Sequence, residues 1–216
     1  MQPQVISVNA GKPQSYVYGG KELSTGIFKS PVSSPLYLHK NQLEGDGQAD
    51  LSVHGGPDKA LCAYCVEHYS YWERQLGIKL EPGAFGENLT LQGALEENVS
   101  IGDIFELGEA VVQVTQPRQP CHKIAKRHDA PDLPQLVQST GYTGYYFRVL
   151  QEGIVPFRPQ LKLIQKHSLG VSIGYANRIK YGDKQNREGI AMVLSVAELS
   201  ESWRNSFTKR LSELEG

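Results

Sequence analysis

Short runs of β-favouring residues, each ended by glycine, proline, asparagine or aspartate, constrain the fold of this chain most strongly. They fill the part of the sequence before residue 166. They predict strands at 4–8, 27–28, 35–38, 89–91, 104–107, 111–115, 142–150 and 161–164. The 22 glycines and 12 prolines of the 216 residues exceed the typical combined share of about 12%. This excess favours many turns and short strands over a helix bundle.

Local signals connect some of these strands and add two helices. Gly108 is free to adopt a positive φ and predicts a hairpin turn between the strands on either side of it. Apolar residues spaced three and four apart predict a helix over 66–76, and Gly77 ends it. A second, shorter helix is expected over 133–139.

The chain changes character after residue 168, where predicted strands give way to predicted helices. Apolar periodicity places three helices over 171–181, 187–194 and 200–214. In the last, apolar residues four apart form one stripe, and Ser200 is placed to cap the N-terminus. So short a segment buries too little surface to hold a large core alone, and we expect it to pack on the β-rich part. The predicted domains are therefore 1–168 and 169–216.

Charge and composition exclude several classes of protein. With 22 basic and 23 acidic side chains, the formal net charge is −1, so an electrostatic nucleic-acid binder is not expected. The longest apolar run, 60–66, is far shorter than the ~18 residues needed to span a bilayer. The first ten residues lack the basic start and apolar core of a secretory signal. Three cysteines, an odd number, do not suggest a disulfide framework and favour a reducing cytoplasmic location.

The segment 117–123 carries the strongest signal for chemistry. Two prolines stiffen the backbone just after a predicted strand, so Cys121 is expected on a loop of restricted shape. Basic residues surround it with no acid among them, namely Arg118, Lys123, Lys126 and Arg127. A positive field favours the thiolate, the form of cysteine that attacks substrates or binds metals. The alternative is a half-buried structural cysteine beside a solvated basic loop.

Two glycine-rich turns are further candidate sites. In His54-Gly55-Gly56-Pro57-Asp58-Lys59, adjacent glycines can turn N–H groups toward an anion, and the lysine adds a charge that pairs with phosphate. His54 and Asp58 flank that turn, close enough to share a proton with a bound group. Asn88 follows another glycine-rich turn and can donate to a ligand. Taken alone, each segment is more typical of an ordinary turn that exposes polar side chains.

The pair Cys62-Ala-Tyr-Cys65 has the spacing of redox and zinc sites. A four-ligand zinc site would have to recruit Cys121 and a distant histidine, His54 or His68. Because the pair lies in the most apolar stretch of the chain, we expect both thiols to be small core side chains. The sequence lacks the signatures of nucleotide-binding loops, α/β-hydrolases and zincins.

Taken together, these segments resemble the MOSC domain, a family named for the C-terminal part of molybdenum cofactor sulfurase. The similarity is carried in order by HGGPDK, FGEN, IGD, QPRQPC and GYYFRVLQEG, which begin at 54, 85, 101, 116 and 144. It covers about residues 1–165, and LSESWRNSF at 199–207 resembles the three-helix appendage of the YiiM branch, the 6-N-hydroxylaminopurine resistance proteins. Tyr145 departs from the pattern, because related chains often carry tryptophan there.

The resemblance implies a mainly β, α+β fold: a strand-rich β-barrel with peripheral helices and a small three-helix subdomain. It implies a molybdenum-pterin cofactor with Cys121 as the metal ligand and, at family level only, pyridoxal phosphate binding. It implies that Lys59 and Arg118 form charge-assisted bonds to the cofactor's phosphate and pterin edge. It also implies close contacts between the cofactor and Gly55, Gly56 and Asn88.

The activity that the resemblance implies is reduction of N-hydroxylated compounds, such as 6-N-hydroxylaminopurine, to amines. A flavin-dependent partner reductase supplies two electrons, the N–O bond breaks, and two protons release amine and water. Asp58 and His54 are the predicted proton carriers, since a histidine pKa of ~6.5 permits uptake and release at neutral pH.

Three other functions remain open from the sequence. The chain could be a molybdenum-cofactor or sulfur carrier without turnover. It could be a cofactor-independent thiol enzyme that uses Cys121, His54 and Asp58. It could also be an interaction domain stabilised by zinc on Cys62 and Cys65. The expected partner is a small N-hydroxylated substrate rather than nucleic acid or membrane, and the chain is expected to be a monomer or a homodimer.

Overall fold

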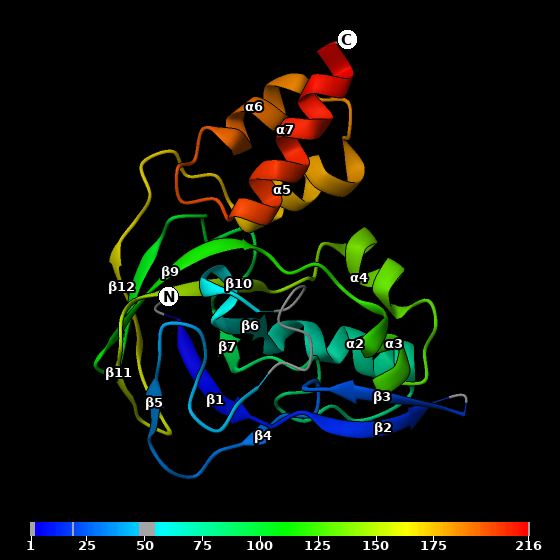
Figure 1. Cartoon of the computed structure of the whole chain (residues 1–216), viewed down its shortest axis with the longest axis vertical. Helices are drawn as coiled ribbons and strands as arrows, with labels where there is room; N and C mark the ends of the chain where they lie inside the picture. Colours follow the sequence, from blue (N-terminus) through cyan, green and yellow to red (C-terminus); the bar gives the residue numbers. More distant parts are fainter. Residues whose placement is uncertain (1–2, 19, 48–54, 216) are drawn as a thin grey trace.

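A computed structural model describes residues 3–18, 20–47 and 55–215 of the chain, and a curled sheet forms its centre (Figure 1). The strands of this sheet are β1 Gln4–Ala10, β4 Ser30–Pro31, β6 Leu61–Cys65, β7 Leu89–Gln92, β8 Ile104–Leu107, β9 Ala110–Pro117, β10 Tyr145–Gln151 and β12 Leu161–Gln165. They form an eight-stranded sheet in the order β12-β8-β9-β10-β6-β7-β1-β4. Only β6 and β7 pair in parallel within it.

The sheet curls into a half-barrel around an apolar core. An isolated bridge between Gln4 and Gln160 brings the start of β1 beside the residue that precedes β12. Strand β9 is buried along nearly its whole length, because the barrel core covers one face and the C-terminal segment covers part of the other. Two small sheets flank the half-barrel: β2 Gln14–Tyr18 with β3 Lys21–Thr25, and β5 Leu36–Leu38 with β11 Gly153–Val155.

Three helices lie on one side of the sheet: α2 Tyr69–Leu76, α3 His122–Arg127 and α4 Leu133–Thr140 (Figure 1). A 3-10 turn, η2 Val66–His68, leads into α2, and another, η1 Pro57–Lys59, precedes β6. These helices enclose a second core, in which Trp72 is fully buried and its Nε1 donates to the Tyr64 hydroxyl at 2.6 Å.

The C-terminal helices pack together at one end of the molecule (Figure 1). They are α5 Ile173–Asn177, which continues into a π-helical turn η3 Arg178–Gly182, then α6 Arg187–Leu194 and α7 Glu201–Glu215. Trp203 and Phe207 are fully buried and belong to the same apolar cluster as the barrel core. The segment therefore packs on the β-rich part, as its short length predicts.

The structure confirms the mainly β, α+β fold and most of the predicted elements. The helix over 66–76 is η2 followed by α2, and Gly77 ends it with a φ of 67°. Gly108, with a φ of 65°, forms the hairpin turn between β8 and β9. Ser200 caps α7, because its Oγ accepts from the Trp203 amide at 3.3 Å. Among the described residues, no helix combines the length and apolar character that crossing a bilayer requires.

One strand prediction is wrong, and several elements were missed, among them β6, the β2–β3 hairpin, α3 and β11. Residues 27–28 are irregular, because the Ile27 carbonyl accepts from Arg127 rather than from a neighbouring strand. Strand β6 is buried at every position, so it shows no alternation of apolar and polar residues. The β2–β3 hairpin is missed for the opposite reason, since its sequence is largely polar.

Candidate functional site

A pocket opens where β6, the end of β9, the start of α3 and the segment after β3 meet. Four cationic side chains line it: Lys29, Lys59, Arg118 and Lys123. No acidic side chain is among the described residues that line it. Two thiols, Cys62 and Cys121, also face this pocket. It is therefore suited to an anionic ligand held beside sulfur.

Cys121 reaches the pocket because β9 ends just before it. Past Pro117, the chain leaves the sheet, and the Arg118 amide donates to the Gly144 carbonyl at 3.0 Å. Cys121 then precedes α3, where its carbonyl accepts from the Ile124 amide at 3.2 Å. Its side chain is half-buried and its thiol is free. The predicted loop of restricted shape is thus a short link between a strand and a helix.

Arg118 is the buried cation of the pocket, only 7% exposed. Burial acts to lower the pKa of its guanidinium, but Cys62, Tyr146 and Cys121 beside it outweigh that effect and raise the pKa. The guanidinium is therefore a permanent positive charge next to both thiols. Such a group is suited to hold a phosphate or a polar ring edge by charge-assisted hydrogen bonds.

Cys62 differs from Cys121 in its environment. Cys62 is 6% exposed, and burial raises the pKa of its thiol to about 11, although the positive charge of Arg118 opposes this shift. At neutral pH the Cys62 side chain is accordingly a neutral thiol. The expectation of a small buried side chain is met, but the sequence did not indicate that Cys62 would also line the Cys121 pocket.

A chain of polar contacts fixes the part of the pocket wall that Lys29, Cys62 and Asn88 form. Lys29 and Asp46 form a buried ion pair, and Asp46 Oδ2 accepts from Asn88 Nδ2 at 2.8 Å. Asn88 Nδ2 also donates to the Asn9 carbonyl at 3.3 Å, and Asn88 Oδ1 accepts from the Cys62 amide at 3.0 Å. Asn88 lines the pocket as predicted, but its amide is engaged by the protein and positions Lys29 and Cys62. Sequence reasoning missed Lys29 and Asp46, which carry no local signal.

Glu87 is a buried carboxylate that shapes the neighbouring turn. It accepts from the amides of Gly83 and Phe85 and from the Thr90 hydroxyl, each at 2.9 Å, and from the Tyr69 hydroxyl. These bonds hold the glycine-rich turn whose Gly86 and Asn88 face the pocket. The negative charge of Glu87 also compensates part of the buried positive charge near Arg118.

The paired-glycine turn contributes less to this pocket than the sequence predicts. Lys59 lines it, and burial lowers the pKa of that side chain against the opposing effect of Asp58. Gly56 has a φ of 97°, but neither it nor Gly55 is among the described residues lining the pocket. His54 lies outside the described residues.

Asp58 faces the C-terminal helices instead of the pocket. Its Oδ1 accepts from Arg148 Nη2 at 2.7 Å, and its Oδ2 accepts from the Glu201 amide at 3.0 Å. Asp58 is not among the described residues that line the pocket. The proton-carrier role expected of it finds no support in this geometry, which gives it the role of joining the barrel to α7.

The thiols also fail to form the zinc pair considered from the sequence. Cys62 and Cys65 lie three residues apart on β6, so their side chains point to opposite faces of the strand. Cys62 belongs to the pocket described above, whereas Cys65 lies on the other side.

The fold and the site define a class: a β-rich domain with a cationic pocket, suited to an anionic ligand, next to a half-buried cysteine. Comparison with known families makes this specific. Residues 50–160 match the MOSC domain, and residues 171–214 match the YiiM-like 3-alpha helix domain. The chain therefore belongs to the MOSC family and carries the YiiM-type C-terminal extension.

Several relatives span nearly the whole chain. "Uncharacterized protein YflK" of Bacillus subtilis (strain 168) is 54% identical over 97% of this chain and 95% of its own length. "Protein YiiM" of Escherichia coli (strain K12) is 41% identical over 95% of this chain and 91% of its own. The crystal structure of YiiM from Geobacillus stearothermophilus has a TM-score of 0.84 at 42% identity, covering 97% of this chain and 99% of that one.

A more distant relative carries a functional name. "Reductase" of Gibberella moniliformis (strain M3125 / FGSC 7600) is 32% identical over 75% of this chain. The match covers 29% of that longer protein.

Proposed function

We propose that this chain is a cytoplasmic, molybdenum-cofactor-dependent reductase that converts N-hydroxylated compounds such as 6-N-hydroxylaminopurine to amines. The observation that carries the proposal is a half-exposed thiol, Cys121, in a pocket lined by four cations and no described acid. Membership of the MOSC family and a relative named as a reductase support the same activity.

The donor set of the pocket fits a phosphate-bearing metal cofactor. A cysteine thiolate is a soft ligand for a metal, and Cys121 is the pocket thiol that is not deeply buried. Arg118 and Lys59 would hold the phosphate and the pterin edge, while Lys29 is held at the wall by Asp46 and Asn88. When bound, the cofactor supplies the two-electron chemistry, and the protein supplies orientation and charge.

The overall reaction requires a second protein. Cleavage of the N–O bond consumes two electrons and two protons and yields one amine and one water. The electrons come from a flavin-dependent reductase, which is oxidised in the process. Because Asp58 is bound by Arg148 and the Glu201 amide, His54 is the proton carrier that remains from the sequence analysis.

The test compares the two pocket thiols in full-length protein expressed in a molybdenum-replete host. Molybdenum, pterin and hydroxylaminopurine reduction are measured on the same samples of unmodified protein, Cys121→Ser and Cys62→Ser. We expect Cys121→Ser to keep its fold by circular dichroism but to lose molybdenum and reduction. The Cys62→Ser variant should retain molybdenum, since burial keeps that thiol neutral. If only Cys62→Ser lost molybdenum, the metal ligand would be Cys62, and our assignment of Cys121 would be wrong.

A second comparison addresses the cations. Lys59→Met removes one charge from the pocket, and Lys162→Met removes one from an exposed pair with Glu106 on β12 and β8. Only the first should lower cofactor content. Molybdenum at one per chain without turnover would indicate a carrier, and reduction by metal-free protein would indicate a thiol enzyme. Either result would refute the proposed activity.

A further inference from the structure

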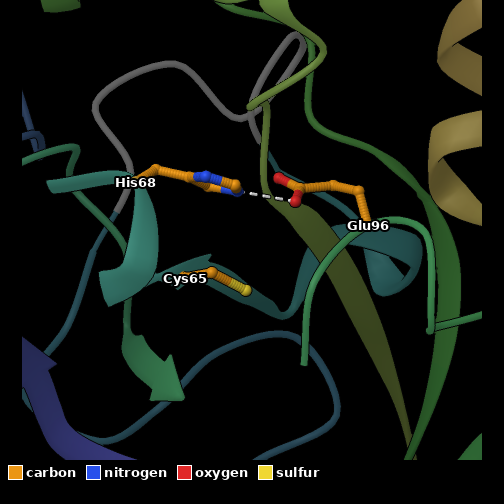
Figure 2. Close-up of side chains that lie close together, drawn as sticks. All are labelled: Cys65, His68 and Glu96. Carbon is orange, nitrogen blue, oxygen red and sulfur yellow. Dashed lines mark hydrogen bonds and ion pairs between the residues drawn. The ribbon is translucent and has the colours of Figure 1, made fainter. Parts of the chain in front are cut away.

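A second cluster of ligand-type side chains lies apart from the Cys121 pocket. Cys65 ends β6, His68 ends the η2 turn, and Glu96 lies in the loop after β7. One potential ligand atom of each lies within 4.8 Å of the others. Figure 2 shows the three side chains directed toward a common space. All three residues are buried, with exposed fractions of 0%, 6% and 4%.

Surrounding contacts hold each side chain in this orientation. His68 Nε2 lies 2.8 Å from Glu96 Oε2, and the other carboxylate oxygen, Oε1, accepts from the Gly144 amide at 2.8 Å. The imidazole stacks on the Tyr142 ring with centroids 3.9 Å apart. The Cys65 thiol donates to the Ala94 carbonyl at 2.9 Å. Secondary contacts of this kind orient metal ligands in proteins.

We propose that Cys65, His68 and Glu96 bind one divalent metal ion, and that Zn²⁺ matches the site best. Zinc accepts thiolate, imidazole and carboxylate ligands together, whereas Mg²⁺ and Ca²⁺ prefer oxygen alone. Two anionic ligands and a neutral imidazole balance the charge of the ion. That balance matters, because an uncompensated charge is costly at such depth.

Binding exchanges a proton for the ion. On binding, the Cys65 thiol loses its proton, and His68 coordinates through Nε2 as a neutral imidazole that carries its one proton on Nδ1. Glu96 keeps its bond to the Gly144 amide through Oε1. The site therefore releases the Cys65 proton as it fills, so its affinity increases with pH.

Solvent reaches the cluster from one side. His68 and Glu96 line a second pocket between α4, the loop after β7 and the C-terminal helices. Cys65 lies behind them and is fully buried. An ion can enter from this pocket, and a water molecule from it completes tetrahedral coordination.

The competing explanation is a buried His–Glu pair beside a core thiol, with no metal. The chain offers a matched control for it, since His167 Nε2 and Glu198 Oε2 form a second partly buried pair at 3.0 Å. The only metal-ligand group found among the described residues is the cluster around Cys65. A His167→Gln variant therefore removes a His–Glu pair without removing a predicted ligand.

The experiment uses Co²⁺ as a spectroscopic substitute for Zn²⁺. The protein is the full-length Cys62→Ser/Cys121→Ser variant, in which Cys65 is the one cysteine left of three. After treatment with a chelator, it is titrated with Co²⁺ and then with Zn²⁺ in competition with a chromophoric chelator. We expect one ion per chain and a thiolate-to-cobalt charge-transfer band. Because the other two thiols are absent, this band reports Cys65 independently of the proposed reductase function.

Variants then assign the ligands. Cys65→Ser preserves a donor to Ala94, and Glu96→Gln preserves the size of the side chain. Each should weaken Zn²⁺ binding by at least about 100-fold, whereas His167→Gln should not. Circular dichroism checks that the variants fold, and the cobalt spectrum tests the site without altering it. Absence of the charge-transfer band, or equal Zn²⁺ affinity in Cys65→Ser and its parent, would overturn the proposal.

Discussion

Replacement of Asp58 by alanine separates two roles for this residue: proton carrier or link to the C-terminal helices. In the structure its carboxylate accepts from Arg148 Nη2 at 2.7 Å and from the amide of Glu201, the first residue of α7, at 3.0 Å. Arg148 Nη2 also donates to the Glu198 carbonyl at 2.9 Å. Removal of the carboxylate leaves a partly buried guanidinium and the start of α7 without this partner.

The expected loss of stability follows from these two contacts. A hydrogen bond to a charged group contributes about 1.5–3 kcal/mol. The lower part of this range applies, because the Asp58 and Arg148 side chains are 25% and 24% exposed. Loss of an anionic acceptor at a helix N-terminus adds roughly 0.5–1 kcal/mol. The sum, about 2–3 kcal/mol, lowers the Tm of a chain of this size by roughly 4–12 °C.

Fluorescence-detected unfolding measures this effect. The chain has two tryptophans, Trp72 in α2 and Trp203 in α7, so a Trp72→Phe background reports the C-terminal helices. Asp58→Asn retains a neutral acceptor and should lose about half as much stability as Asp58→Ala. Glu106→Ala, which breaks an exposed pair, should change stability by less than about 0.5 kcal/mol. Unchanged unfolding of Asp58→Ala together with lost reduction would refute our reasoning and restore the proton-carrier role.

Two further predictions concern the pocket and the backbone beside it. The alkylation rate of Cys62, followed by mass spectrometry, should rise about tenfold per pH unit from pH 8 to 10. The reason is that a pKa of about 11 keeps the thiolate a small fraction of the thiol over this range. A plateau of the rate near pH 9 would contradict that pKa. Gly144→Ala should destabilise the fold by at least about 3 kcal/mol, since the added Cβ would lie 2.2 Å from the Ala63 carbonyl oxygen at a φ of +68°. Gly141→Ala, at a φ of +73° with no atom within 4 Å of its Cβ, should cost only about 1–2 kcal/mol in denaturant unfolding. Equal losses in the two glycine variants would show that the close contact does not matter.

Elements with strong local signals were predictable from the sequence. The hairpin at Gly108, the helix that Gly77 ends and the apolar stripe of α7 each depend on residues within a few positions of one another. Strand β6 was not predictable by the same reasoning, because burial on both faces removes the alternation that marks a strand.

The basic, acid-free surroundings of Cys121 are a property of the sequence, and the pocket around this residue retains them. By contrast, the position of Asp58 was decided by tertiary structure, since the Glu201 amide that it accepts from is 143 residues away. The same is true of Lys29, Asp46 and Asn88, which come from three separate segments and meet only when the sheet curls. Local pattern determines which backbone conformation a segment adopts, because turn chemistry and periodicity act between near neighbours. The partner of a polar side chain is determined by the packing of distant segments. That packing places Asp58 against the start of α7 and Cys62 in the wall of the pocket.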